Sequence, residues 1–292
     1  MRIALLGLGL IGGSIARALH VRPANGTDDI TISAWSPSGV GPVAAARDGV
    51  IDVVAREPAE AISGADLIVL AGPATACLAQ LDELAGVWRD APAPGAVVTD
   101  VASTKKAMVE RASELGLRFV GGHPMAGRET SGYAASSPDL FRDRPWVIVP
   151  SDDAEAIERV EMLATATGAR PLRMTAAAHD DAVAAISHLP LIVAAAVVEA
   201  VASGSSDPAG RAATAELAAS GWRDSTRLAR GDVAMGAGIV STNAPAIAPR
   251  VRELIRVLEG WLAELERTGG PDEAAVSERL RAARDELESM TP

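Results

Sequence analysis

The chain begins with a strand, turn and helix pattern that limits its first domain to one kind of fold. An apolar run, Arg2 to Leu6, leads directly into Gly7-Leu8-Gly9-Leu10-Ile11-Gly12, and a helical pattern follows. In such a G-x-G-x-x-G turn the first glycine allows a tight turn, the second a close approach of backbone to a pyrophosphate, and the third close packing of helix on strand. The spacing predicts a dinucleotide site at Gly7, Gly9, Leu10, Ile11 and Gly12, with phosphate at the helix N-terminus.

Strands and helices alternate through the first part of the chain. Further apolar runs, separated by Ala-rich helical stretches, predict strands at 67–70, 97–100, 118–121, 146–149 and 170–174. This alternation predicts an α/β fold with a parallel sheet, a Rossmann-type domain over residues 1–174. From Thr175 onward strand patterns disappear, and residues 175–292 are expected to form an all-α domain. A chain of 292 residues is long enough for two such cores.

The cofactor choice depends on the end of the second strand, which is expected at 30–34 after a polar loop, 22–29. An NAD site places an acidic residue there for the ribose hydroxyls, whereas an NADP site prefers a small polar residue beside an Arg. This chain has Ser36 and no adjacent Arg, and Asp28 and Asp29 lie at the wrong end of the strand. Both NAD and NADP therefore stay open. Gly72 and Pro73, after another strand, are expected beside the nicotinamide half.

His123 is the candidate for proton transfer. It follows the strand predicted at 118–121 in a stretch rich in Gly, Ser and Thr, up to Gly132. Ligands of open α/β sheets bind beyond the carboxyl ends of strands, and imidazole has the ordinary pKa that suits proton transfer near neutral pH. The alternative is a His in a Gly-rich surface loop. Ser103 lies between the strand 97–100 and the next helix, where a helix N-cap and a site residue are compatible roles.

The helical part of the chain contains two more histidines. His179 and His188 belong to an expected long helix, 176–201, and are nine residues apart, or about two and a half turns. On a straight helix they face opposite sides, so both cannot line one pocket unless Pro190 distorts the helix. His179 is expected to be a polar residue near a helix start. For His188, a site role and a core role both stay open.

An arginine cluster follows in an otherwise acidic protein. Arg223, Arg227 and Arg230 lie close to Asp224. Arg binds carboxylates in bidentate geometry, so an Arg here suits a substrate carboxylate, with Asp224 orienting it. The alternative is a salt-bridged surface turn. The later helical stretches, 249–265 and 272–287, have charge pairs at helical spacing, and an apolar stripe along them would suit a dimer interface.

Composition excludes several classes of function. With 38 acidic and 27 basic residues, the net charge of -11 argues against binding to nucleic acid or to an anionic membrane surface. The single cysteine, Cys77, permits no intrachain disulfide and no multi-cysteine metal site, and no metal is expected. The N-terminus has no cleavage pattern, and no uninterrupted apolar run reaches 18 residues. A soluble, cytoplasmic protein is expected.

Together these motifs resemble the prephenate dehydrogenase family of tyrosine biosynthesis, including the neighbouring arogenate dehydrogenases, over essentially the whole chain. The resemblance rests on the glycine turn and four further motifs, which are 100–105, 122–127, 179–180 with 187–190, and 223–227. It implies that His123 accepts a hydrogen bond from the substrate ring hydroxyl, that Ser103 supports it, and that Arg227 holds a substrate carboxylate. It also implies NAD or NADP as cofactor and a homodimer joined through the helical domains.

The chain departs from this family at two places. Leu191 stands where the family commonly has a second His, and Asp232-Val233-Ala234-Met235-Gly236 stands where it often has Asp-Pro-x-Met-Trp. Both changes leave the choice between prephenate and arogenate open. Two other classes are a hydroxyacid or imine reductase, which normally relies on a Lys at the start of the helical domain, and a non-enzymatic nucleotide sensor. The only lysines here are Lys105 and Lys106.

Overall fold

A computed structural model describes residues 1–21, 30–128, 130–204 and 208–290. The chain divides into two compact units, Met1–Ile247 and Ala248–Pro292, and each is described by itself. The polar loop expected at 22–29 and Glu129 of the His123 stretch lie outside the described residues.

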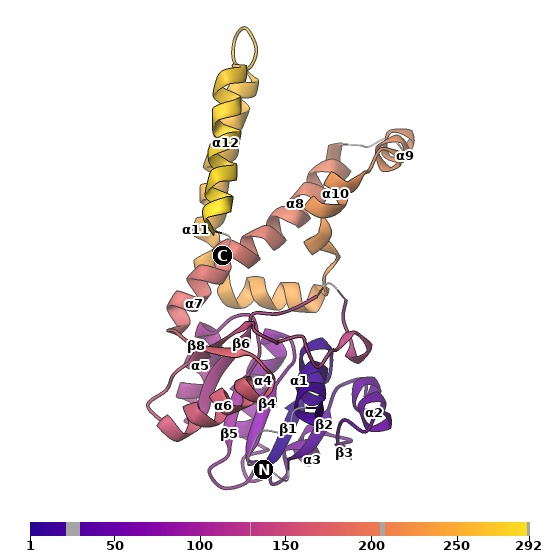
Figure 1. The fold of residues 1–292 in the computed structure, drawn as a ribbon, viewed down its shortest axis with the longest axis vertical. Coiled ribbons are helices and arrows are strands. Elements are labelled where there is room, and N and C mark those ends of the chain that lie inside the picture. Colours follow the sequence, from indigo (N-terminus) through magenta and orange to yellow (C-terminus); the bar gives the residue numbers. More distant parts are fainter. Residues whose placement is uncertain (22–29, 129, 205–207, 291–292) are drawn as a thin grey trace. The chain divides into compact units, whose positions relative to one another are not determined.

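The first unit is built on one sheet (Figure 1). Within the described residues, eight strands pair in the order β3-β2-β1-β4-β5-β6-β7-β8. From β1 to β3 successive strands are added toward one edge of the sheet, and from β4 onward they are added toward the other edge. The strand order therefore reverses between β1 and β4, which is the switch point where ligands of open α/β sheets bind. The strands are β1 (Arg2–Leu6), β2 (Thr31–Trp35), β3 (Val53–Val54), β4 (Leu67–Leu70), β5 (Val97–Asp100), β6 (Phe119–Pro124), β7 (Pro145–Val149) and β8 (Arg170–Arg173).

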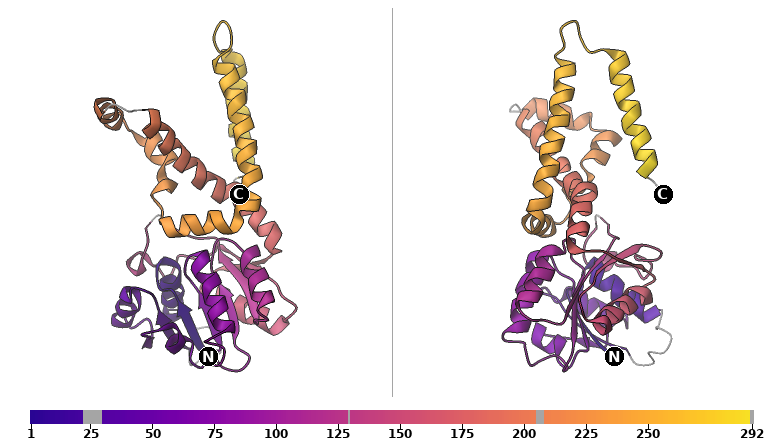
Figure 2. Two further views of the ribbon diagram at one scale, coloured as in Figure 1. Left: turned by 180° about the vertical axis from the view of Figure 1, so that it is seen from behind. Right: turned by 90° about the vertical axis from the view of Figure 1, so that its left-hand side faces the viewer.

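Helices cover both faces of this sheet (Figure 2), because its strands are apolar on both sides. On β1, Ile3 and Leu5 belong to one buried cluster with residues of α1 and α6, whereas Ala4 and Leu6 belong to a second cluster with residues of α4 and α5. This alternation is the period of two that a strand imposes. The helices are α1 (Leu10–Val21), α2 (Val40–Arg47), α3 (Pro58–Ile62), α4 (Ala74–Ala85), α5 (Lys106–Glu114) and α6 (Ala154–Ala166), with a 3-10 turn η1 (Tyr133–Ala135).

The alternation of strands and helices had predicted a parallel sheet, but one pair of strands among the described residues is antiparallel. β7 runs antiparallel to β6, and this pairing extends β6 to Pro124. His123 therefore lies inside the strand, opposite Val147, and not in the loop after it. The added ladder holds the backbone of His123 rigidly at the carboxyl edge of the sheet.

The helix expected over 176–201 is broken into three parts, α7 (Ala176–Val183), a π-helical turn η2 (Ala184–His188) and α8 (Leu189–Gly204). Pro190 lies two residues after the end of this turn. Proline has no N–H to continue an i→i−4 ladder, and π-helical turns relieve such interruptions. The rest of the first unit contains α9 (Pro208–Glu216), α10 (Ser220–Ser225), a 3-10 turn η3 (Arg227–Arg230) and the first part of α11 (Val233–Leu265), which is kinked at Asn243.

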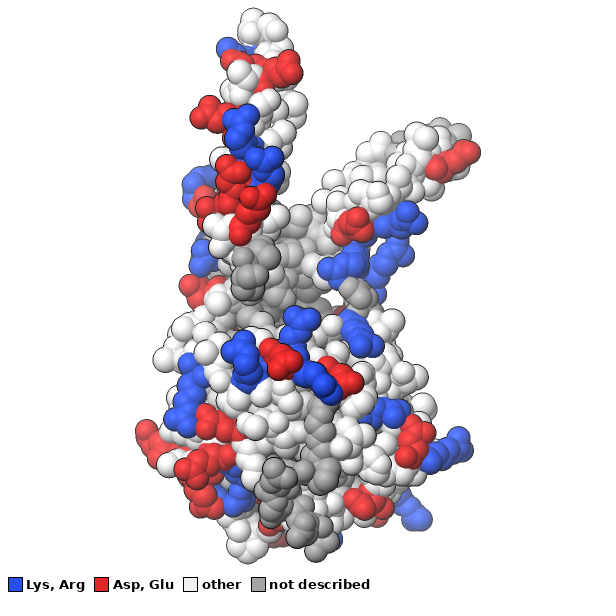
Figure 3. Space-filling view, in the orientation of Figure 1, with Lys and Arg blue, Asp and Glu red and all other residues white. Residues whose placement is uncertain are grey.

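The second unit is a helical hairpin made of the rest of α11 and of α12 (Glu273–Met290). Its two helices are joined by the Arg279 guanidinium, which lies 4.0 Å from the Trp261 ring centroid and donates to the Val257 carbonyl. Apolar side chains of both helices are exposed, including Leu258, Leu262 and Leu280. Mixed acidic and basic side chains follow α12, whereas α8 of the first unit presents mostly uncharged ones (Figure 3).

Candidate active site

The glycine turn after β1 has the geometry that a dinucleotide site requires. Gly7 has a φ of 112°, and a Cβ there would lie 2.5 Å from the Ala71 carbonyl oxygen. A Cβ on Gly12 would lie 2.1 Å from the Gly7 carbonyl oxygen, so packing excludes any larger residue. A Cβ on Gly9, in contrast, would meet no atom within 4 Å. Gly9 thus faces open space at the start of α1, and these residues fit a pyrophosphate.

The neighbouring turns complete the cofactor edge. Leu10 and Ile11 open α1, whose first-turn N–H groups have no partner inside the helix. Ser36 follows β2, and its Oγ is buried without a hydrogen-bond partner among the described residues. Gly72 and Pro73 follow β4, the strand next to β1 on the other side. An orphaned buried hydroxyl at the end of β2 fits a ribose or phosphate oxygen.

His123 is joined to a second histidine. Its Nδ1 lies 2.8 Å from Nε2 of His179, and the two rings meet edge to face at 78°. His179 is fully buried at the start of α7, and its Nδ1 lies 2.7 Å from Oδ1 of Asp180. The three side chains therefore form a continuous chain of contacts from β6 to α7. The sequence had suggested that His179 is only a polar residue near a helix start, but in the structure it links His123 to Asp180.

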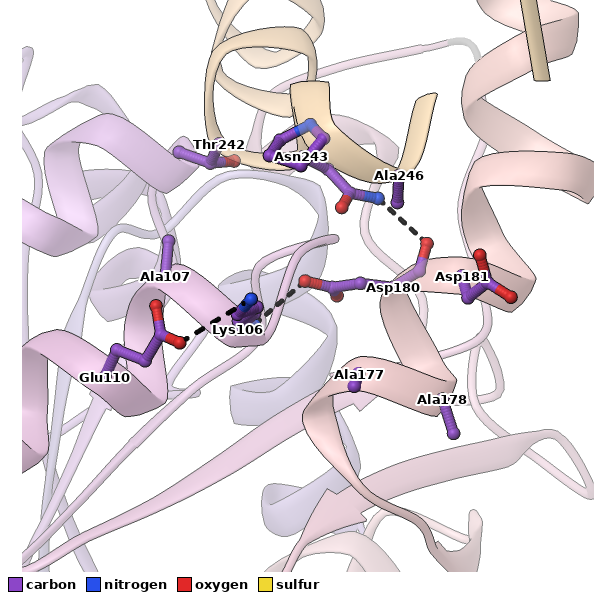
Figure 4. A pocket seen from close by; sticks show the side chains of 11 residues that line it. Lys106, Ala107, Glu110, Ala177, Ala178, Asp180, Asp181, Thr242, Asn243 and Ala246 are labelled. Atoms are coloured by element: carbon purple, nitrogen blue, oxygen red, sulfur yellow. Dashed lines mark hydrogen bonds and ion pairs between the residues drawn. The ribbon is translucent and has the colours of Figure 1, made fainter. Parts of the chain in front are cut away.

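Asp180 also anchors the start of α5. Its carboxylate accepts hydrogen bonds from the backbone N–H groups of Lys105 (2.7 Å) and Lys106 (2.9 Å), and Asn243 donates to its carbonyl oxygen (Figure 4). Burial raises the pKa of Asp180, but the hydrogen bonds from His179 and from the two backbone N–H groups outweigh it and leave this pKa below its ordinary value. Asp180 is therefore ionised at neutral pH.

His188 reaches the same region because of the π-helical turn. Nδ2 of Asn243 lies 3.1 Å from Nδ1 of His188 and donates also to the Asp180 carbonyl, so one amide joins the two residues. Nε2 of His188 is buried, and the backbone of Ser103 lies within hydrogen-bonding reach of this ring. Burial lowers the pKa of His188 to about 4, so the ring is neutral at pH 7. The π-helical turn is thus the helix distortion that His179 and His188 needed in order to lie in one region.

A buried ion pair lies beside His123. Lys105 and Asp100 are both fully buried and in direct contact, and Asp100 also accepts from the backbone N–H groups of Ala102 and Gly122. Burial, then the charges of His179, Lys105 and His188, hold the pKa of His123 well below its ordinary value. His123 is therefore a neutral imidazole at pH 7, as a general base must be.

The remaining candidate residues are placed differently. Ser103 is half-buried in the loop between β5 and α5. It is not the N-cap of α5, because this helix begins at Lys106 with Lys105 as its N-cap residue, and Asp180 accepts its first N–H groups instead. Arg227 and Asp224 are exposed on η3 and α10, and η3 packs on α8. The structure thus brings His123, His188 and the Ser103 loop together.

The segment after His123 is fixed to the cofactor helix. Arg17 of α1 stacks on the Tyr133 ring, 4.4 Å from its centroid, and both side chains bond to the Asp48 carboxylate. The backbone N–H of Ser137 donates to the Ser14 hydroxyl of the same helix. The strand that carries His123 is thereby connected to the glycine turn through packed side chains.

The two departures from the family pattern lie side by side. A Cβ placed on Gly236 would lie 3.7 Å from Cδ2 of Leu191. The polar group lost at 191 and the large group lost at 236 therefore belong to one place, between α8 and α11.

A pocket of about 600 Å³ adjoins the residues that link His179 to His188 (Figure 4). Asp180 and Asn243 contribute to its wall, and its other lining residues belong to α5, α7 and α11. His123 is not among them. This pocket therefore does not contain the candidate base.

The sequence did not reveal His179, Asp180, Asn243 and Lys105 as parts of the site. A signal existed for the first two, because a His-Asp pair at a helix start can link a partner ring to a carboxylate. Asn243 gave none, since a kink in a long helix depends on tertiary packing. Lys105 belongs to the motif 100–105, but no site role was predicted for it, since a buried ion pair also depends on tertiary packing.

Comparisons with known proteins agree with this geometry. Residues 16–172 match the family model "Prephenate dehydrogenase, nucleotide-binding domain", and residues 175–273 match "Prephenate dehydrogenase, dimerization domain". The prephenate dehydrogenase of Bacillus subtilis is 36% identical over 266 residues, which are 88% of this chain and 68% of that protein.

Solved structures give the same result. Synechocystis arogenate dehydrogenase has a TM-score of 0.74 and 30% identity, covering 98% of this chain and 100% of that one. Prephenate dehydrogenase from Aquifex aeolicus, in complex with hydroxyphenyl propionate and NAD+, has a TM-score of 0.84 and covers 100% and 98%; at 24% identity it bears on the fold alone.

The fold and the glycine turn define an NAD(P)-dependent dehydrogenase with a Rossmann-type domain followed by a helical domain. The two family models cover most of the chain in order, and the Bacillus relative aligns with 88% of it at 36% identity. The chain belongs to the prephenate dehydrogenase family.

Proposed function

We propose that this chain oxidatively decarboxylates prephenate to 4-hydroxyphenylpyruvate with NAD or NADP, a step of tyrosine biosynthesis. The observation that supports this reaction most is the neutral imidazole of His123 at the carboxyl edge of the sheet that carries the cofactor glycines. The name of the Bacillus subtilis relative supports the substrate.

The substrate is a cyclohexadienol with a ring carboxylate, and its ring becomes aromatic as carbon dioxide leaves. Nicotinamide, when bound at the glycine edge, accepts the hydride. The protein must align the ring with this cofactor and withdraw the hydroxyl proton as positive character develops at the carbinol carbon. His123 takes that proton, a contribution of typically ~10²–10⁴-fold. Loss of the ring carboxylate in forming an aromatic ring supplies the driving force.

Other residues bind and orient. Ser103, half-buried after β5, supports the substrate hydroxyl, and the buried His188 lines the same region. Arg227 holds a substrate carboxylate, with Asp224 orienting it. We assign Arg227 to binding, because a tight ion pair with the departing carboxylate would disfavour decarboxylation. On the cofactor edge, Gly7, Gly9, Leu10, Ile11, Gly12, Ser36, Gly72 and Pro73 contact the dinucleotide.

Arogenate is the second candidate substrate. It carries an amino group where prephenate has a keto group, and the Synechocystis protein named arogenate dehydrogenase is 30% identical. Leu191 and Gly236 adjoin each other between α8 and α11. They supply neither the polar imidazole nor the large indole that the family commonly has at these two positions. A reductase mechanism has less support, because Lys105 is held in a buried pair with Asp100.

The domain boundary and the assembly belong to the same proposal. We place the boundary at residues 174 and 175, and the change of family model between 172 and 175 supports it. By length and composition the stretch Ala176–Gly204 is apolar enough to cross a membrane, and 22% of its apolar 18-residue window is buried within the chain. It belongs to the segment matched by the dimerization domain, so we propose that a second copy covers it, in a cytoplasmic homodimer that binds neither membrane nor nucleic acid.

The test is a two-by-two assay of prephenate and arogenate against NAD and NADP. Reduced cofactor and released carbon dioxide should appear in equal amounts with at least one pair. Reduced cofactor without carbon dioxide would indicate a different reaction, and no turnover with any pair would indicate a nucleotide-binding protein.

A further inference from the structure

Three groups in series connect His123 to a fixed negative charge. Asp180 Oδ1 lies 2.7 Å from His179 Nδ1, and His179 Nε2 lies 2.8 Å from His123 Nδ1. Both contacts are at hydrogen-bond distance, and His179 and Asp180 are almost fully buried. In each contact one of the two atoms must carry the shared proton as the donor. The choice of donor in the Asp180–His179 contact therefore determines the donor in the His179–His123 contact.

The direction of the series is set at Asp180. Its carboxylate is an acceptor only, and two backbone N–H groups at the start of α5 already donate to it. His179 must therefore carry its proton on Nδ1, toward Asp180. In a neutral ring this leaves a lone pair on Nε2, and the facing Nδ1 of His123 must then carry a proton as the donor.

We propose that His179 and Asp180 are positioning residues that hold His123 in the Nδ1–H tautomer, so that its Nε2 always presents a lone pair to the substrate hydroxyl. This inference rests on the proposed function of His123 as the base. In the reaction the substrate O–H bond breaks and an N–H bond forms at Nε2 of His123. The resulting imidazolium keeps its Nδ1–H toward His179, and Asp180 stabilises the positive charge through that ring.

Nearby charges act against the protonated product and make this stabilisation necessary. A protonated His179, the buried Lys105 ammonium and a protonated His188 would each repel an imidazolium at His123. Asp100 is already paired with Lys105. Asp180 is thus the carboxylate that reaches His123 through a described series of contacts.

The direct test is the tautomer itself, read from ¹⁵N chemical shifts of imidazole nitrogens in the full-length apo protein at pH 7.5. The chain has four histidines, so the spectrum is simple. His20, exposed at the end of α1, is assigned with His20→Gln, which also serves as the control variant. We expect His123 and His179 both as Nδ1–H. Nε2–H on His123, or a doubly protonated His179, would overturn the proposal.

Two substitutions at His179 separate positioning from packing. His179→Gln keeps an acceptor near the position of Nε2, whereas His179→Met fills similar space without one. His179→Met should let the His123 tautomer change and lower kcat by ~10-fold or more, within what a positioned base contributes, with KM within several-fold. His179→Gln should restore most of the tautomer and of kcat. Equal effects of the two variants on both readouts would refute the proposal.

The tautomer measurement needs no turnover, which keeps the two proposals distinguishable. If neither prephenate nor arogenate is oxidised, the proposed function fails while the ¹⁵N result still decides the tautomer. If His123 proves to be Nε2–H while His123→Asn abolishes turnover, the base assignment stands and the positioning role falls.

Discussion

Gly9 and Gly12 belong to one motif and should respond to alanine in opposite ways. A Cβ on Gly12 would lie 2.1 Å from the Gly7 carbonyl oxygen, a backbone atom that cannot turn away. A Cβ on Gly9 would meet nothing within 4 Å, and Gly9 has no positive φ. Packing therefore requires Gly12 to be a glycine, and only a bound cofactor requires Gly9 to be one.

The structure sets the expected magnitudes. Gly12→Ala overpacks the contact between α1 and β1, which typically costs ~1–3 kcal/mol of unfolding free energy, or roughly 2–12 °C in Tm for a domain of this size. Gly9→Ala should leave stability unchanged or raise it by ~0.4–1 kcal/mol, because alanine restricts the unfolded chain. If its methyl group displaces the pyrophosphate at a similar cost of ~1–3 kcal/mol, Kd rises about 5- to 150-fold.

The assay pairs thermal unfolding without cofactor with calorimetric titration of NAD and of NADP, for both variants and the wild type. Gly9→Ala should keep the wild-type Tm and lose affinity for both cofactors. Gly12→Ala should lower Tm. A Gly9→Ala protein that binds both cofactors with wild-type Kd would refute the placement of the pyrophosphate.

Three further predictions concern single side chains. Arg227→Ala should cost ~2–5 kcal/mol of substrate binding and raise KM at nearly constant kcat; an unchanged KM would make Arg223 or Arg230 the carboxylate anchor. Ser36→Asp should suppress NADP use selectively, so the ratio of kcat/KM for NAD over NADP rises; an unmoved ratio would mean that Ser36 does not face the adenosine ribose. His188 has a pKa of about 4 when folded and ~6.5 when unfolded, so the unfolded chain takes up the proton first as pH falls. The free energy of unfolding should therefore drop by about 3 kcal/mol between pH 6.5 and 4, a drop that urea titrations should find reduced in His188→Gln.

Local sequence patterns predicted the first domain closely. The strands at 67–70 and 97–100 have the predicted bounds, because buried parallel strands are short apolar runs between turns. The glycine turn was predictable for the same reason, since Gly12 packs against the Gly7 carbonyl five residues away and Gly7 packs against Ala71, just after the adjacent strand β4. The antiparallel direction of β7 was not, because strand direction depends on the path of the connection.

The site was only partly predictable. His123 was found from its place after an apolar run, but its partner His179 was not, because their contact joins residues 56 apart in the sequence. The position of His188 was left open because a straight helix turns it away from His179; the π-helical turn before Pro190 changes that geometry, and no local pattern fixes where such a turn forms. Asn243, which joins Asp180 to His188, lies 55 residues from His188 and becomes a neighbour only through folding.

The most direct test of the account is steady-state kinetics of His123→Asn against pH, with His20→Gln as the control. Because the pKa of His123 lies well below its ordinary value, wild-type kcat/KM should stay level from pH 8 to below pH 6.5 before it falls. His123→Asn should keep KM within several-fold, lower kcat by ~10²-fold or more, and lose this acid limb. A His123→Asn enzyme with wild-type kcat would contradict the assignment of His123 as the base.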